Sequence, residues 1–249
     1  VRVTQLTDGD FDVNAIVGFS GTSVLVTRND MNHAPEVYSY DLAKKTWKQI
    51  TKVNDEAYAK IASCKTEKRW VTTTDGKKML VWVILPPNFD KTKKYPALLY
   101  CQGGPQSALT QSYSFRWNFQ LMASQGYVIV APNRRGMPGH GTAWNEQISG
   151  DWGGQVMDDY LAAIDDVAKE SYVDKSRLGA VGASYGGYSV FQLAGIHKNR
   201  FKTFISHCGI FNTESMYGTT EEVFFTNWDS GGAYWEKDNV KAQKTYNEF

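Results

Sequence analysis

The sequence has few cysteines, no long apolar run and no excess of one charge, and each absence excludes a class of protein. The three cysteines, Cys64, Cys101 and Cys208, are odd in number and lack metal-ligand spacing. They indicate no disulfide framework, and two of them sit in or at the end of apolar strands, where a thiol behaves as a small hydrophobic group. We expect no metal and no cofactor.

Charge and hydropathy exclude two kinds of partner. The 27 basic side chains are balanced by 26 acidic ones, and the lysines are scattered, so nucleic acid is not an expected partner. No run approaches the roughly 18 apolar residues of a membrane span. The amino terminus shows neither a secretory signal pattern nor an initiator methionine, and we therefore expect the chain to start inside a longer protein.

The sequence is rich in hydrophobic residues, which make up 42% of it and include 14% aromatics. This content is ample for a packed core in a chain of this length. The first part, residues 1–65, contains short β-rich runs between turn signals, which predict antiparallel hairpins that together have the size of one propeller blade. These runs are residues 23–27, 36–41 and 46–51.

Residues 66–249 show a different rhythm, in which strands alternate with helical segments. This alternation predicts an α/β fold with a largely parallel sheet and helices on both faces. In the amphipathic helix expected over residues 155–169, Val156, Tyr160 and Ile164 share one face, while Asp158 and Asp159 lie mostly off it. The expected strands are residues 79–85, 97–101, 127–131, 178–181 and 203–207, and a further helix is expected over 115–124.

The most informative segment is Leu178–Tyr188, where an aliphatic run meets a glycine-flanked serine and then an apolar helical pattern. A serine between a strand and a helix in a Gly-x-Ser-x-Gly setting is typical of a nucleophile elbow. The motif alone occurs by chance in glycine-rich turns, but the predicted strand and helix around it favour a catalytic Ser184. The backbone N–H of Tyr185, at the start of that helix, would face an acyl oxyanion.

A second oxyanion donor is expected from the loop after the strand over residues 97–101. Gln102-Gly103-Gly104-Pro105 follows that strand, and its glycines allow backbone N–H groups to approach a substrate oxygen. By itself this segment could be an ordinary tight turn. Beside the predicted elbow, it favours Gly103 as the other half of an oxyanion hole.

Four motifs in order resemble the catalytic domain of serine peptidases of the prolyl oligopeptidase family. They are the loop from Gln102, Asn133–Gly136 with Gly139-His140-Gly141, Gly153–Asp159, and Gly182–Tyr188. The resemblance covers about residues 70–215 and is strongest to the branch of acylaminoacyl-peptidases and bacterial dipeptidyl-peptidases. It implies an α/β-hydrolase domain preceded by a β-propeller, of which residues 1–65 would be about one blade, and a periplasmic or secreted location, although a cytoplasmic one stays open.

The resemblance also implies roles for particular residues. Ser184 would be the nucleophile, and the N–H groups of Tyr185 and Gly103 would bind the oxyanion. Many relatives have histidine at the position of Gln102, so no role is carried over to that side chain. Aromatic residues would form the pocket for the substrate residue before the scissile bond, although plain packing explains each of them about as well; they are Tyr188, Tyr217, Phe224, Phe225 and Trp228.

The general base and its supporting acid have no convincing candidates. A serine needs an adjacent imidazole, and in this fold the order is Ser, then Asp or Glu, then His. His197 and His207 come too soon after Ser184, and Asp229 and Asp238 are acids by order alone, of a kind that more often form turns or are solvated. We therefore expect the chain to end before the acid and the base, and to be inactive alone.

The function that these features predict is a serine exopeptidase that releases dipeptides or acyl-amino acids from peptide N-termini through an acyl-enzyme. Two alternatives stay open, a non-catalytic binding or scaffold module with a hydrolase fold and a small-ester esterase. The expected partner is a peptide substrate. Self-association and the preference for the residue before the scissile bond are left open.

Overall fold

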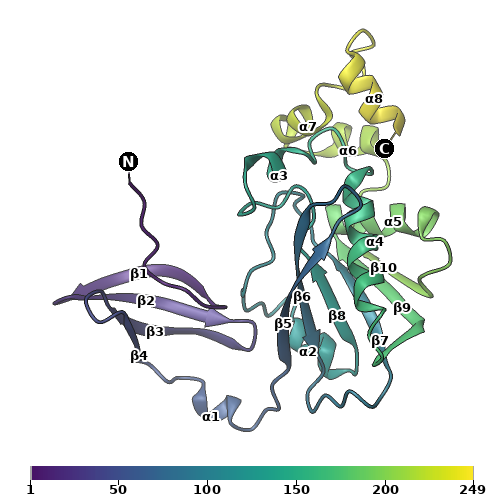
Figure 1. Ribbon diagram of the computed structural model, residues 1–249. Helices are drawn as coiled ribbons and strands as arrows, with labels where there is room; N and C mark the ends of the chain where they lie inside the picture. The colour runs from purple at the N-terminus through teal and green to yellow at the C-terminus, as the bar shows by residue number, and fades with distance from the viewer. Residues whose placement is uncertain (1, 249) are drawn as a thin grey trace. The chain divides into compact units, whose positions relative to one another are not determined.

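The computed structural model describes residues 2–248, shown as a ribbon in Figure 1. The chain divides into two compact parts. One comprises residues 1–66, 84–89 and 110–126, and the other comprises residues 67–83, 90–109 and 127–249. The proposed domain boundary near residue 65 stays a prediction.

The first part contains a four-stranded antiparallel sheet in the order β1-β2-β3-β4. The sequence predicts β2, β3 and β4 but misses β1, whose pairing with β2 is interrupted by register shifts between Val13 and Ala15 and between Ile16 and Gly18. A short helix, α1 (Asp55–Tyr58), follows the sheet. The strands are β1 (Asp12–Ser20), β2 (Ser23–Asp30), β3 (His33–Asp41) and β4 (Thr46–Gln49).

The helix expected over residues 115–124 is shorter than predicted. It is α2 (Phe119–Ser124), and Asn118 precedes it with an extended backbone. The Asn118 side chain accepts the N–H of Leu121 at 2.9 Å, which makes Asn118 the N-cap. The prediction was therefore wrong for residues 115–118. The apolar pattern runs through Asn118, but this residue caps the N-terminus of the helix and does not lie inside it.

The second sheet has six strands in the order β10-β9-β7-β8-β6-β5. The pairings of β10 with β9, β9 with β7 and β7 with β8 are all parallel. The α/β architecture with a mostly parallel sheet is thus confirmed. Its strands are β5 (Lys65–Thr72), β6 (Lys78–Leu85), β7 (Tyr95–Cys101), β8 (Val128–Pro132), β9 (Val173–Ala183) and β10 (Thr203–His207).

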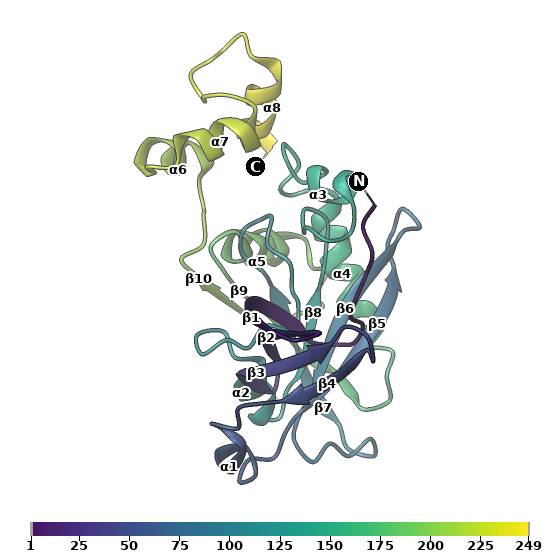
Figure 2. The ribbon, with the colours of Figure 1, turned by 90° about the vertical axis from the view of Figure 1, so that its left-hand side faces the viewer.

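Two helices provide most of the apolar cover for the central strands. Helix α4 (Gln155–Val167) packs on β7 and β8, and α5 (Tyr185–Ile196) packs on β7, β9 and β10. Strand β8 is completely buried, which explains its uninterrupted apolar sequence. The short helix α3 (Thr142–Glu146) and the last three helices lie beyond one end of this sheet in both ribbon views (Figures 1 and 2); the last three are α6 (Thr213–Thr219), α7 (Val223–Ser230) and α8 (Val240–Glu248).

One residue of α4 departs from the predicted amphipathic pattern. Asp159 is fully buried, although the sequence places it mostly off the apolar face. Its carboxylate accepts the backbone N–H of Arg135 at 2.9 Å and lies 3.3 Å from Nε of the same residue. The prediction was wrong because helical periodicity cannot show that an arginine from another segment reaches the buried face.

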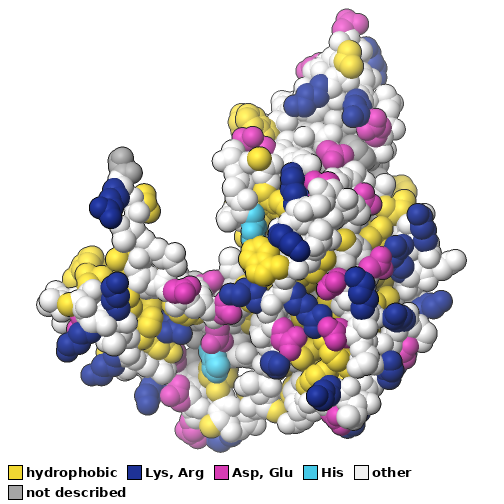
Figure 3. All heavy atoms as spheres, in the orientation of Figure 1, with side chains coloured by type: hydrophobic (Ala, Val, Ile, Leu, Met, Phe, Trp, Pro, Cys, Tyr) yellow, Lys and Arg dark blue, Asp and Glu magenta, His cyan; other side chains and the backbone are white. Residues whose placement is uncertain are grey.

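Among residues 2–248, no helix combines the length and apolar character that crossing a bilayer requires. Basic and acidic side chains are intermixed on the face of the molecule shown in Figure 3. This distribution offers no continuous positive stripe on that face.

Candidate active site

Ser184 lies at a sharp turn between β9 and α5. Its backbone has φ 57° and ψ −124°, a conformation that non-glycine residues rarely adopt, and its side chain is exposed. The Ser184 N–H donates to the carbonyl of His207 at 3.0 Å, and its own carbonyl accepts the N–H of Tyr188 at 3.0 Å. The residue before the helix is therefore fixed by hydrogen bonds on both sides, while its hydroxyl faces outward.

The glycines around Ser184 are required by close backbone contacts. A Cβ atom on Gly182 would lie 2.7 Å from the carbonyl oxygen of Cys101, on the neighbouring strand β7. A Cβ atom on Gly186 would overlap that same carbonyl group. Only residues without a side chain allow β7, β9 and α5 to meet at this point.

The loop after β7 brings Gly103 beside the serine. A Cβ atom built on Gly103 would stand 3.5 Å from the Ser184 Cβ and 3.0 Å from the carbonyl oxygen of Ala183. Tyr185 is the first residue of α5, where backbone N–H groups have no partner within the helix. The two proposed oxyanion donors thus belong to segments that border the same serine, and their role stays a prediction.

The side chains of Tyr185 and Tyr188 are buried under the turn. Their rings stack with centroids 5.6 Å apart, and both contact Trp152 edge-on. The Tyr185 hydroxyl donates to the carbonyl of Trp152 at 2.7 Å. Burial raises the pKa of both phenols, so both hydroxyls stay protonated at neutral pH.

A pocket of about 440 Å³ lies beside α7. Phe224 and Trp228 are 81% and 65% exposed, and Phe225 reaches inward to Trp152, with ring centroids 6.2 Å apart. The pocket combines these three predicted aromatic residues with polar ones; its lining is Gln106, Asn145, Glu146, Ser149, Phe224, Phe225, Trp228 and Asp229.

Tyr217, also predicted for the substrate pocket, packs elsewhere. Its ring contacts Tyr234, Trp235 and Tyr246, and its hydroxyl donates to Asn227 at 2.8 Å. In the structure, it holds helices α6, α7 and α8 together. Tyr188 packs under the turn against Trp152 and Tyr185 and does not line the pocket beside α7, and a substrate-binding role for Tyr188 and Tyr217 stays a prediction.

Asp229 is a residue whose environment the sequence did not reveal. We expected a turn former or a solvated group, but its side chain is almost fully buried in α7. It accepts hydrogen bonds from Trp152 Nε1 at 2.9 Å, from Ser149 Oγ at 3.0 Å and from Gln106 Nε2 at 3.3 Å. This carboxylate therefore ties α7 to the loop that carries Gly103.

Three of the histidines contact residues other than Ser184. Nδ1 of His197 accepts the N–H of Phe201 at 3.1 Å, and His140 lies against Trp144. The His33 ring lies 2.8 Å from a carboxylate oxygen of Asp30. The assignment of the acid and the base beyond these residues stays a prediction.

A mostly parallel sheet, an exposed serine at a strained strand-to-helix turn and a glycine loop beside it define the α/β-hydrolase class. Residues 113–249 match the family model described as the prolyl oligopeptidase family. The chain belongs to this family, as the resemblance of its motifs predicted.

Relatives of known name share about half of their aligned residues with this chain. It is 53% identical over 247 residues to the dipeptidyl-peptidase 5 of Porphyromonas endodontalis, covering 98% of this chain and 35% of the relative. It is also 53% identical to the Porphyromonas gingivalis dipeptidyl-peptidase 5, with 98% and 36% covered. The chain thus spans about a third of the length of these relatives.

Solved structures show the same fold at lower identity. The acylaminoacyl peptidase of Pyrococcus horikoshii aligns with a TM-score of 0.82 and 24% identity over 96% of this chain and 38% of its own. A puromycin-hydrolysing peptidase of Mycobacterium tuberculosis aligns with a TM-score of 0.68 and 19% identity, over 90% and 35%. These alignments confirm the fold class.

Proposed function

We propose that the protein is a serine peptidase that removes dipeptides from the N-termini of peptides. The observation that carries this proposal is the exposed Ser184 at its strained turn, with the glycine loop of Gly103 beside it. The names of the relatives at 53% identity favour dipeptide release over the release of acyl-amino acids.

The proposed reaction begins with attack of Ser184 Oγ on the carbonyl carbon of the scissile bond. The carbonyl oxygen becomes an oxyanion, which the N–H groups of Gly103 and Tyr185 would stabilise. The C–N bond then breaks, and the amine leaves with the proton that a general base took from Ser184. Water hydrolyses the resulting ester and releases the dipeptide.

The pocket beside α7 is proposed to hold the apolar side chain before the scissile bond. Phe224, Phe225 and Trp228 supply its aromatic surface, and the loop of Gly103 reaches it through Gln106. An apolar side chain gains affinity by leaving water for such a surface. W228A should therefore lower kcat/KM for apolar substrates about tenfold or more, and an unchanged value would exclude this pocket.

The decisive experiment is labelling of the full-length protein with a fluorophosphonate, followed by assay on chromogenic dipeptide substrates. We expect one label for each chain on Ser184, turnover of the dipeptide substrates, and loss of both in S184A. S189A is a matched control, because Ser189 is a buried serine of the same helix whose hydroxyl donates to the Tyr185 carbonyl at 3.0 Å.

Other outcomes separate the alternatives. No labelling at Ser184 would favour a scaffold module. Labelling with turnover of simple esters but of no peptide would favour an esterase. Turnover restricted to acylated substrates would replace dipeptide release with release of acyl-amino acids.

A further inference from the structure

We propose that Arg134 is a positioning residue that holds both halves of the oxyanion hole in place through one buried guanidinium. This inference rests on the proposed function of Ser184. Arg134 is the second residue after β8 and is fully buried. The sequence predicted neither its burial nor its contacts. There, Arg134 was only part of the Asn133–Gly136 motif on which the family resemblance rests.

The first half of the site is held through carbonyl groups of the glycine loop. Arg134 Nη2 donates to the carbonyl of Gln102 at 3.0 Å, and Nη1 donates to the carbonyl of Pro105 at 2.7 Å. These carbonyls flank Gly103 and Gly104. Fixing their direction fixes the peptide planes on either side, including the plane that carries the Gly103 N–H.

The second half is held through an aromatic ring. The guanidinium carbon of Arg134 lies 4.8 Å from the centroid of the Tyr185 ring, within the range of a cation–π contact. Tyr185 carries the other proposed donor on its backbone. The same guanidinium therefore touches the loop on one side and the first residue of α5 on the other.

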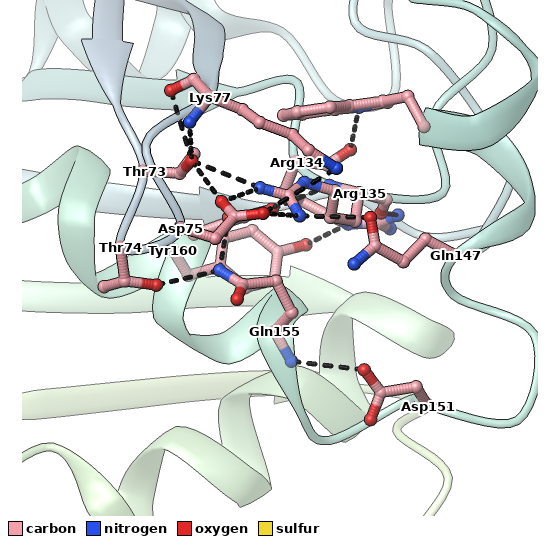
Figure 4. A network of polar contacts seen from close by, with 12 residues as sticks. Thr73, Thr74, Asp75, Lys77, Arg134, Arg135, Gln147, Asp151, Gln155 and Tyr160 are labelled. Carbon is pink, nitrogen blue, oxygen red and sulfur yellow. Dashed lines mark hydrogen bonds and ion pairs between the residues drawn. The ribbon is translucent and has the colours of Figure 1, made fainter.

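The remaining contacts set the orientation of the guanidinium. Nε donates to the Tyr160 hydroxyl at 3.0 Å, and Nη1 also donates to the carbonyl of Arg135 at 2.8 Å. Figure 4 shows Arg134 with Tyr160 of α4 and the neighbouring Arg135 in the same network of polar contacts. Within the described residues, all of the hydrogen-bond partners of Arg134 are neutral.

Arg134 differs from the neighbouring Arg135 in having no carboxylate partner among the described residues. Arg135 is also fully buried, but it is paired with Asp75 at 2.6 Å and with Asp159 at 3.3 Å (Figure 4). A buried cation without a carboxylate is costly to maintain. Its charge is not cancelled locally, so it also favours negative charge that develops on a neighbouring oxygen.

The test compares R134K, R134M and Y160F in the full-length protein with dipeptide substrates. We expect R134M to lower kcat about 10–100-fold, a loss below or near that of removing one oxyanion donor. KM should change by less than about threefold, because ground-state binding is not what Arg134 supports. R134K keeps the charge with fewer hydrogen-bond donors, and its kcat should lie between those of R134M and the wild type. The kcat of Y160F, which removes one acceptor of Arg134, should also lie between these values.

The matched control is R200K, since Arg200 pairs with Asp165 in a half-exposed position. It should keep the wild-type kcat and KM. Unfolding by urea shows which variants are folded, and if R134M fails to fold, Y160F and R134K decide.

Two results overturn the inference, and they can be told apart. Folded Arg134 and Tyr160 variants with wild-type kcat, or with losses carried mainly by KM, would refute the positioning role alone. A wild-type protein whose Ser184 is never labelled by fluorophosphonate would refute the proposed function together with this inference.

Discussion

At the scale of single residues, buried charges are the features that most distinguish this molecule. Arg134, Arg135 and Asp159 are all fully buried within the hydrolase sheet and its helices. Burial raises the pKa of Asp159 to about 6, against an ordinary value of 3.8, and the hydrogen bond from the Arg135 N–H opposes this only in part. Hydrogen bonds that Arg135 and Thr73 donate to Asp75 instead hold the pKa of that carboxyl well below its usual range.

The raised pKa of Asp159 predicts a pH dependence of stability. The folded protein keeps this proton up to about pH 6, whereas the unfolded chain releases it near 3.8, so raising the pH across this window favours unfolding. Relative to D159N, the wild type should lose up to about 3 kcal/mol of unfolding free energy between about pH 4 and pH 6. Urea unfolding across this range measures the difference.

The control for this prediction is D158N, which changes the exposed neighbour on the same helix. It should follow the wild-type pH dependence. A constant difference between the wild type and D159N across the window would contradict the prediction. The contribution of Asp75 has the opposite sign and is lost only as the pH falls below about 4, so it does not interfere.

At the scale of elements, the junction of β7, β9 and α5 determines where the serine stands. Strands β7 and β9 and helix α5 approach one another so closely that no side chain would fit at Gly182 or Gly186. The strained backbone of Ser184 is maintained by this packing and by the hydrogen bond to His207. Geometry at the site is therefore a product of packing, not of the loop alone.

Two alanine substitutions in α5 test this view. G186A should destabilise the protein by about 1–3 kcal/mol or more, because its Cβ would overlap the rigid carbonyl group of Cys101. G195A is the matched control, because a Cβ there meets nothing within 4 Å. It should stabilise the helix by about 0.5–1 kcal/mol.

Urea unfolding of both variants gives the measurement. If G186A were as stable as G195A, the backbones at the turn would be able to separate without loss. The proposed need for glycine at position 186 would then be wrong.

At the scale of the whole molecule, the chain combines an antiparallel four-stranded sheet with an α/β-hydrolase sheet. The ends of β9 and β7 lead into the serine turn and the glycine loop, and α7 supplies an aromatic pocket. The His33 ring bonds Asp30, however, and the His197 ring accepts the Phe201 N–H, so these two imidazoles are engaged elsewhere. Without a base, the serine hydroxyl is a weak nucleophile at neutral pH.

This arrangement predicts that the 249-residue chain, expressed alone, turns over dipeptide substrates on the order of a millionfold more slowly than a complete serine peptidase. The measurement is the release of chromophore by the wild-type chain and by S184A. Equal rates for the two are expected. A rate that depends on Ser184 would show that a base is present in these residues after all.

Much of the fold could be predicted because its signals are local. Alternating strands and helices, the buried β8 and the glycine-flanked Ser184 all follow from neighbouring residues, and the α/β class and the family are confirmed. The turn at Ser184 was predictable because a small set of residues fits a strand-to-helix corner. The start of α2 was predicted too early, because hydrophobic periodicity does not show that Asn118 caps the helix.

Other features could not be predicted because they depend on residues that are distant along the chain. Asp229 looks like a loop acid in sequence, yet Trp152 and Ser149 bury it. Tyr217 and Phe225 are both aromatic residues in the segment after the last strand, but Tyr217 packs against other aromatic rings, including Tyr246 of α8, and Phe225 lines the pocket. The residue type at each of these positions does not show which distant residues it contacts in the folded chain.

The sequence by itself determined the type of fold, the family and the position of the serine turn, because hydrophobic periodicity and glycine placement act over a few residues. The tertiary structure alone decided that Arg134 joins the glycine loop to Tyr185 and that Arg135 meets Asp75 and Asp159. A buried charge is stable only where several separate segments supply its partners, and those segments meet only in the folded chain.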